Sequence, residues 1–262
     1  MKIHCIKFVF ILSLICCFFL SCLSNKPNEQ EGELAFPLEF SGNSSGNQWL
    51  PGSPYGYEIW AARGDNNRLL WYGPNERGGA GFRAEWVYVT NFLGRVGLFW
   101  NEGKSYAEYG NLYCDFEFTR SENGSAGGFS YIGIYGWSRN PMIEYYIVED
   151  WFWSGVITPM TMGGGAVKMG EFFVDGETYF IYQATRPASA ANIEGTFTPF
   201  LQFFSVRQTC RQSGTISITE HFREWEKLGM MLGDNMYEAK FLVETSSGEG
   251  WFDASYISFY QE

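Results

Sequence analysis

The chain has 262 residues and a formal net charge of −11 at pH 7, and 19% of its residues are aromatic. This length is enough for one sizeable hydrophobic core and does not require a second domain. A strongly acidic chain without a basic stripe is not expected to bind nucleic acid, because phosphate contacts depend on clustered lysine and arginine side chains.

The first residues have the pattern of an export signal. Lys2 and Lys7 place positive charge before the apolar stretch 8–20, which is too short to favour a membrane-spanning helix. We therefore expect residues 1–21 to be a signal peptide and the protein to be secreted or held at the cell surface. The four residues that end at Cys22 resemble a loose bacterial lipobox. Cys22 therefore either carries a lipid anchor or lies near an ordinary signal-peptidase cleavage site.

The next segment and the body of the chain differ in composition. Residues 22–48 are rich in Asn, Ser, Gly, Pro and Glu, which is typical of a tether or loose N-terminal arm. Beyond it, short apolar and aromatic runs alternate with turn residues, and segments 57–60 and 82–88 alternate with a period of two. Together with 31 glycines, this pattern favours an all-β sandwich or barrel.

Segment 129–137 is the clearest predicted strand. Its alternation divides the side chains into an aliphatic face and a face of rings with glycine, namely Ser130, Ile132 and Ile134 against Phe129, Tyr131, Gly133, Tyr135 and Trp137. The aliphatic face fits a core between two sheets. The ring face is suited to a concave surface that binds sugar.

One helix is expected near the C-terminal end. Thr219 is a plausible N-cap, and Phe222, Trp225 and Leu228 form an apolar stripe. Gly229 follows where a helix commonly stops. We expect this helix to have a structural role and to cover the back of a sheet.

Cysteine and histidine give few signals. In the predicted catalytic part only Cys114 and Cys210 could pair, and the sequence leaves open whether they form a disulfide or remain free thiols. The chain has two histidines, His4 and His221, with no cluster of Cys or His around them. We therefore expect no metal site and no cofactor.

Two glutamates, Glu144 and Glu244, lie in aromatic, strand-like segments. Paired carboxylates beside a groove of aromatic rings are typical of glycosidases, in which one carboxylate attacks the sugar and the other transfers a proton. The two-residue period of a strand places Glu144, Tyr146 and Val148 on one face. The local pattern alone also allows Glu144 to be an ordinary solvent-facing residue.

The pattern Tyr-Gly-Trp-x-Arg-Asn-Pro-x-x-Glu-Tyr-Tyr-x-Val at residues 135–148 resembles the nucleophile strand of glycoside hydrolase family 11. These enzymes are β-jelly-roll endo-1,4-β-xylanases, and the resemblance covers most of residues 50–260. It implies an all-β fold over residues 49–262. The expected architecture is a β-jelly-roll sandwich of two antiparallel sheets with one short helix and a thumb hairpin over a concave cleft.

The same resemblance assigns roles to individual residues. It implies that Glu144 is the nucleophile, that Glu244 is the acid/base, and that Asn91 modulates the acid/base. The residues that it places against the substrate are Trp60, Tyr135, Tyr146, Arg186, Ile193 and Gln202.

Three departures from the family pattern affect the cleft. After Glu244 the chain has Thr-Ser-Ser-Gly where the family usually has Gly-Tyr-Gln-Ser-Ser-Gly, and the thumb has Ala191-Asn192-Ile193 where the family usually has Pro-Ser-Ile. Glu238 and Lys240 share the parity of Glu244, at positions where the family has an aromatic and a small apolar residue. Either a bulge hides these two charges or the cleft is unusually charged.

The resemblance implies a monomeric, retaining endo-1,4-β-xylanase that acts on xylan or xylo-oligosaccharides. Retention requires the two carboxyl groups to be about 5–5.5 Å apart, against roughly 6.5–9.5 Å for inversion. Two alternatives remain open at this point. One is a β-1,4-glucanase of a related jelly-roll family, and the other is a non-catalytic xylan-binding module.

Overall fold

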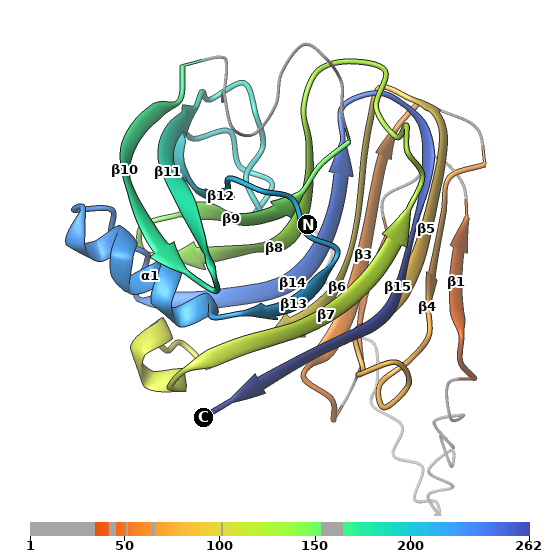
Figure 1. The fold of residues 1–262 in the computed structure, drawn as a ribbon, viewed down its shortest axis with the longest axis horizontal. Helices are drawn as coiled ribbons and strands as arrows, with labels where there is room; N and C mark the ends of the chain where they lie inside the picture. The colour runs from red at the N-terminus through yellow and green to blue at the C-terminus, as the bar shows by residue number, and fades with distance from the viewer. Residues whose placement is uncertain (1–34, 42–45, 51, 64–65, 101, 153–164) are drawn as a thin grey trace, which may run out of the picture. The chain divides into compact units, whose positions relative to one another are not determined.

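Two β-sheets packed face to face form the part of the chain that the computed structural model describes (Figure 1). The described residues are 35–41, 46–50, 52–63, 66–100, 102–152 and 165–262, and from Ala35 onward they belong to one compact unit. The signal peptide expected at 1–21 and the lipid expected on Cys22 lie outside these residues. Within them, no helix has both the length and the apolar character needed to cross a bilayer.

The larger sheet has nine strands. Its order is β10 (Val167–Val174), β11 (Glu177–Arg186), β12 (Phe200–Arg207), β9 (Ile143–Asp150), β8 (Ser130–Arg139), β14 (Asn235–Thr245), β6 (Asn91–Phe99), β3 (Tyr55–Ala62) and β2 (Gly46–Trp49).

The smaller sheet has six strands. Its order is β1 (Leu38–Ser41), β4 (Arg68–Trp71), β5 (Phe82–Val89), β15 (Gly248–Gln261), β7 (Leu112–Arg120) and β13 (Ser213–Ile216). A 3-10 helix, η1 (Tyr106–Tyr109), and one α-helix, α1 (Ile218–Lys227), complete the described elements.

The expected all-β sandwich is confirmed, with one correction to the strand directions. The larger sheet is mixed, because β12 and β9 run parallel, with Gln202 opposite Glu144. The hairpin pairs β10–β11 and β11–β12 are antiparallel. This three-strand meander joins the sheet through its last strand, β12, which runs in the same direction as β9.

Strand β8 divides its side chains between two layers, as its alternation predicted. Ile132 and Ile134 belong to the large core between the sheets. Tyr135 and Trp137 belong to a second cluster, on the opposite face of the nine-stranded sheet. We call this second group the cleft cluster; its buried members are Tyr135, Trp137, Tyr146, Val148, Trp151, Tyr182, Phe200, Phe204, Val206 and Leu242. The larger sheet curls around that face (Figure 1).

Helix α1 lies where it was expected, but its N-cap differs. Ser217 is the N-cap. The Thr219 hydroxyl accepts a hydrogen bond from the Leu112 N–H and donates one to the Gly110 carbonyl, so it joins the helix to β7 instead. Trp225 donates its indole N–H to Ser205 on β12 at 2.9 Å. The glycine expected after the helix, Gly229, has a φ of +78°, which suits the left-handed position that ends many helices.

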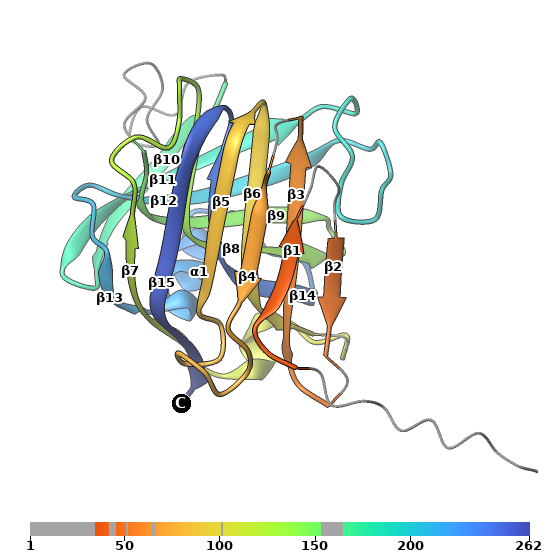
Figure 2. The ribbon, with the colours of Figure 1, turned by 90° about the vertical axis from the view of Figure 1, so that its right-hand side faces the viewer.

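The segment expected to be a tether, 22–48, contributes two edge strands. β1 pairs with β4 in the smaller sheet, and β2 pairs with β3 in the larger sheet (Figure 2). The folded part therefore begins at or before Leu38, although the composition of this segment predicted a loose arm. Cys114 is buried and Cys210 is exposed, and both are free thiols.

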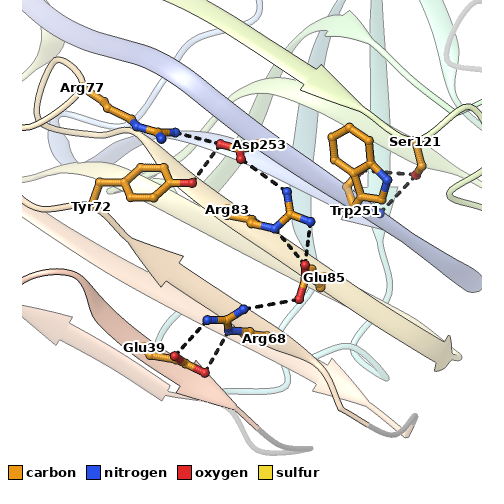
Figure 3. Close-up of polar contacts among 9 residues, drawn as sticks. All are labelled: Glu39, Arg68, Tyr72, Arg77, Arg83, Glu85, Ser121, Trp251 and Asp253. Carbon is orange, nitrogen blue, oxygen red and sulfur yellow. Dashed lines mark hydrogen bonds and ion pairs between the residues drawn. The ribbon is translucent and has the colours of Figure 1, made fainter.

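The outer face of the six-stranded sheet carries a series of ion pairs (Figure 3). Arg68 bridges Glu39 on β1, at 2.8 Å, and Glu85 on β5, at 3.7 Å. Arg83 continues the series: it pairs with Glu85 at 2.6 Å and with Asp253 on β15 at 3.3 Å. Each pair is partly exposed and contributes little by itself, but the series joins four neighbouring strands through their side chains.

Candidate active site

Glu144 and Glu244 line one cavity on the cleft face of the nine-stranded sheet. Its volume is about 420 Å³, and its lining also includes Tyr146, Arg186 and Gln202. A larger cavity, of about 730 Å³, lies at the end of β6 near Trp49 and the C-terminal strand. Its carboxylates, Glu102 and Glu108, are both exposed, whereas the smaller cavity holds two buried carboxyl groups of the kind that catalysis requires.

Glu144 is held in place by three hydrogen-bond donors. It lies on β9 and is only 8% exposed. Its Oε1 accepts hydrogen bonds from the hydroxyls of Tyr135, at 2.7 Å, and Tyr146, at 3.2 Å. Its Oε2 accepts one from the Gln202 amide at 2.5 Å. These donors favour the ionised carboxylate.

Burial and hydrogen bonding act in opposite directions on the Glu144 carboxyl group. Burial raises the pKa of Glu144, while the donors Tyr135, Gln202 and Tyr146 and the positive charge of Arg186 oppose the rise. Glu144 is therefore the member of the pair whose surroundings stabilise a negative charge. An ionised carboxylate with a fixed orientation can act as a nucleophile.

Glu244 has the opposite character. It lies on β14, is 6% exposed, and its buried Oε2 has no hydrogen-bond partner among the described residues. Burial and then the negative charge of Glu144 raise the pKa of Glu244 to about 8, against smaller lowering effects of Tyr146, Arg95 and Arg186. Glu244 is thus protonated at neutral pH, as a general acid must be. The two carboxyl groups titrate as a pair, in which Glu144 loses its proton first.

Most of the other residues expected at the site lie together around these glutamates. Tyr146, Arg186, Gln202 and Asn91 line the cavity. Tyr135 lies behind it and contacts Glu144 directly. The side-chain oxygen of Asn91 is buried without a hydrogen-bond partner among the described residues, and the expected influence of Asn91 on Glu244 stays a prediction.

Trp60 and Ile193 lie at the periphery of the site and do not line the cavity. Trp60 on β3 and Glu244 on β14 both pair with Leu93 of β6, which places the two side chains on the same face of the sheet. Trp60 is 39% exposed, so its ring is available for stacking. Ile193 packs against the edge of the cleft cluster.

Residues 187–199 connect β11 to β12 and correspond to the expected thumb. Asn192 is buried, and its side chain accepts hydrogen bonds from the backbone N–H groups of Glu194, at 3.0 Å, and Thr196, at 3.1 Å. Glu194 forms an ion pair of 3.0 Å with Arg139 at the end of β8. The altered thumb sequence is therefore internally bonded and linked to a cleft strand.

The structure resolves the question raised by Glu238 and Lys240. A register shift does occur between Met236 and Glu238, yet Glu238 pairs with Trp137 and Lys240 with Tyr135. Both charges therefore remain on the cleft side of the sheet, and both side chains are fully buried.

Sequence reasoning missed several residues near the site. Tyr131 and Phe204 line the cavity, and their rings lie 5.2 and 4.8 Å from that of Tyr146. The ring face of segment 129–137 already contained Tyr131, and Phe204 shares a strand face with Gln202, so the two-residue period was an available signal. Arg95, buried beside Glu58 and Glu238, gave no comparable signal, because a lone arginine in an apolar strand does not identify its partners.

Among the described residues, no group of three or more His, Cys, Asp or Glu side chains could hold a metal ion. The arrangement that remains is a pair of buried carboxyl groups with different hydrogen-bond surroundings, on a sheet face covered with aromatic rings. Such an arrangement can perform acid/base and nucleophilic chemistry at an acetal carbon.

Comparison with known proteins gives consistent matches. The profile of a family described as "Glycosyl hydrolases family 11" matches residues 53–255. Endo-1,4-beta-xylanase C of Fibrobacter succinogenes is 44% identical over 215 residues, which are 82% of this chain and 33% of that protein. Endo-1,4-beta-xylanase S20 of Neocallimastix patriciarum is 42% identical over 78% of this chain and 57% of that protein.

A crystal structure of a mutant ENZbleach xylanase has a TM-score of 0.80 and 51% identity, over 87% of this chain and 88% of that one. The matched part of the first curated relatives is shorter than the whole of each protein. This chain spans about a third to just over half of their length.

Proposed function

The chain belongs to glycosyl hydrolases family 11, and from this we propose that it is a retaining endo-1,4-β-xylanase, which cleaves internal β-1,4-xylosidic bonds of xylan. The relatives and the solved structure that resemble it are named as xylanases. The observation that supports the proposal most strongly is the contrast between the two buried glutamates. Glu144 accepts three hydrogen bonds, whereas Oε2 of Glu244 has no partner among the described residues, and burial raises the pKa of Glu244 to about 8.

In the proposed reaction Glu144 attacks the anomeric carbon while Glu244 gives its proton to the leaving glycosidic oxygen. A covalent glycosyl-enzyme forms, and the shortened chain leaves with a free hydroxyl. Glu244, now ionised, removes a proton from water, which attacks the same carbon and releases Glu144. Two inversions give net retention. Once the intermediate has formed, Glu144 carries no charge, which lowers the pKa of Glu244 and prepares it to act as a base.

The remaining site residues are assigned to the substrate. We place a distal sugar on the exposed ring of Trp60, since flat rings stack on sugar faces. Arg186, Gln202 and Tyr146 surround the nucleophile and are assigned to the reacting sugar. Ile193 in the thumb is assigned to the xylan chain bound beneath the thumb. Xylose lacks the hydroxymethyl group of glucose. A glucanase would need additional room in its cleft for this group.

The test is the release of reducing ends from xylan and from carboxymethyl cellulose, by the wild type and by Glu144→Gln. We expect the wild type to act on xylan alone and the variant to act on neither. The first products, followed by proton NMR, should be β-anomers. Faster hydrolysis of the cellulose derivative would identify a glucanase. Binding to xylan without hydrolysis by the wild type would identify a non-catalytic module.

We also propose that the protein is exported and acts as a monomer outside the cell or at its surface. The positive residues Lys2 and Lys7, followed by the apolar stretch 8–20, support export. Labelled palmitate incorporated by the wild type and not by Cys22→Ser would establish the lipid anchor. Soluble, unlabelled wild-type protein in the medium would establish ordinary secretion. Light scattering during gel filtration would test the monomer.

A further inference from the structure

Four charged side chains lie on the cleft side of the nine-stranded sheet, beside the catalytic pair. They are Glu58 on β3, Arg95 on β6, and Glu238 and Lys240 on β14, and we call them the ion cluster. Arg95 pairs closely with Glu58 and lies 3.4 Å from Glu238. Lys240 lies 2.6 Å from Glu238 and 3.6 Å from Glu58. The cluster contains two charges of each sign and is neutral as a whole.

The ion cluster is buried to an extent that ordinary surface pairs are not. The side chains of Glu238 and Lys240 are fully buried, and those of Arg95 and Glu58 are 3% and 20% exposed. Removing four charges from water is expensive, and apolar side chains of similar volume often give equal or greater stability. The position of the cluster on the cleft side of the sheet, next to Tyr135, therefore points to a role other than stability.

One member of the cluster contacts the residues that hold the nucleophile. The Arg95 guanidinium carbon lies 4.3 Å from the centre of the Tyr135 ring. The Tyr135 hydroxyl donates to Glu144 at 2.7 Å and accepts a hydrogen bond from the Trp137 indole N–H. A cation over an aromatic face is attracted to it. It also withdraws electron density from the ring, which makes the phenol a stronger hydrogen-bond donor.

We propose that Arg95 is a positioning residue for the nucleophile: Glu58 and Glu238 hold its guanidinium over Tyr135, and the ring thereby presents its hydroxyl to Glu144. Arg95 acts through Tyr135, the ring over which its guanidinium lies. The assignment rests on the proposed role of Glu144 as the nucleophile. It gives Glu238, a charge that departs from the pattern of the family, a function in holding Arg95.

Several other charged or titratable groups face Tyr135 and Glu144 and must be separated from Arg95 in any test. They are Tyr131 on β8, Tyr146 on β9, Arg186 on β11, and Glu238, Lys240 and Glu244 on β14. Tyr146 donates to Glu144 independently of the cluster. Arg186 lowers the pKa of Glu144 by its charge. The contribution of Arg95 is distinguished from these by its dependence on the Tyr135 ring and hydroxyl.

The primary experiment is a carbon-13 NMR titration of Glu144 in protein labelled at the glutamate carboxyl carbons, with the signal assigned from Glu144→Gln. In Arg95→Met the hydroxyl of Tyr135 becomes a weaker donor, so the ionised form of Glu144 is less stabilised. We expect the pKa of Glu144 to rise by about half a unit or more. We expect the acidic limb of kcat/KM on xylan to move upward by the same amount.

A double-mutant cycle tests the route through Tyr135. Tyr135→Phe alone should also raise the pKa of Glu144, because it removes one donor. Adding Arg95→Met to that variant should then change the pKa very little. The matched control is Arg120→Met, which removes another arginine paired with a buried carboxylate, Asp150, and stacked on a different ring, that of Phe152. This control should leave the titration of Glu144 unchanged.

The charge-balanced variant Glu58→Gln with Arg95→Met covers the case in which the single variant does not fold, since it leaves the neutral Glu238–Lys240 pair. An unchanged pKa of Glu144 in a folded variant would overturn the proposal. An equal shift in the presence and absence of the Tyr135 hydroxyl would also overturn it, because Arg95 would then act directly by its charge. Loss of folding in both variants would make the cluster purely structural. The NMR titration needs no xylan hydrolysis, so its result is separate from the test of the proposed function.

Discussion

Replacing Glu244 by glutamine is expected to stabilise the protein, and to do so more strongly as the pH rises. Folding raises the pKa of Glu244 from an ordinary value of 4.5 to about 8, mainly through burial. Between these values the folded protein keeps a proton that the unfolded chain has released. The stability associated with this group is therefore fully present below pH 4.5 and is lost as the pH rises towards 8. Glutamine has nearly the same shape and does not ionise.

The size of the effect follows from the pH interval. Each unit between the unfolded and folded pKa values corresponds to about 1.4 kcal/mol. From pH 4.5 to pH 7 the penalty accumulates to about 3 kcal/mol. Because the side chain is only 6% exposed, water does little to screen it. The difference in the free energy of unfolding between Glu244→Gln and the wild type should therefore increase with pH. It should be about 3 kcal/mol more favourable to the variant at pH 7 than at pH 4.5.

The assay is urea-induced unfolding, followed by tryptophan fluorescence at several pH values across this interval. Glu249→Gln is the control, since Glu249 is close in sequence but exposed. A difference between wild type and Glu244→Gln that is constant from pH 4.5 to pH 7 would refute the reasoning. It would mean that Glu244 ionises in the folded protein as it does in the unfolded chain.

Three further predictions concern catalysis. Glu144→Ala should lose turnover while keeping xylan binding and the fold, because only the covalent step needs the attacking carboxylate; more than about a tenth of wild-type activity would contradict the assignment. Glu244→Ala should lose much less activity on aryl xylosides with good leaving groups than on xylan, and azide should yield a β-xylosyl azide; equal losses without azide rescue would point to another acid, with Glu249 tested first. Asn91→Asp should move the optimum of kcat/KM towards acid, because a new carboxyl group lining the same cavity joins the coupled titration. An acidic limb at the same pH in both proteins would mean that residue 91 does not influence the titration of the two glutamates.

Local pattern was sufficient to predict the strands that carry the cleft. The two-residue period placed Ile132 and Tyr135 on opposite faces, and the structure assigns them to the core and to the cleft cluster. The period also placed Tyr146 on the face of Glu144, to which it donates a hydrogen bond. These predictions succeed because side-chain direction along a strand is a local property.

Features that depend on distant partners were not predictable from the same pattern. Thr219 looks like an N-cap, but its hydroxyl is occupied by the backbone of Gly110 and Leu112. The parallel pairing of β12 with β9 follows from where the meander joins the sheet, which no local period encodes. The ion cluster is formed by three strands that are distant in sequence. The sequence therefore showed Glu238 and Lys240 only as charged residues at positions where the family has uncharged ones.

The two N-terminal edge strands determine where mechanical force enters the fold. A load applied through the residues before Ala35 reaches β1 first, and β1 is a strand of four residues at the edge of the smaller sheet. The Arg68–Glu39 pair holds it to β4. The next strand, β2, lies at the edge of the other sheet, so the load passes successively to both sheets. Short edge strands detach at low free energy. β1 and β2 can therefore yield under tension, while β14 and β9, which carry Glu244 and Glu144 inside the larger sheet, keep both of their neighbouring strands.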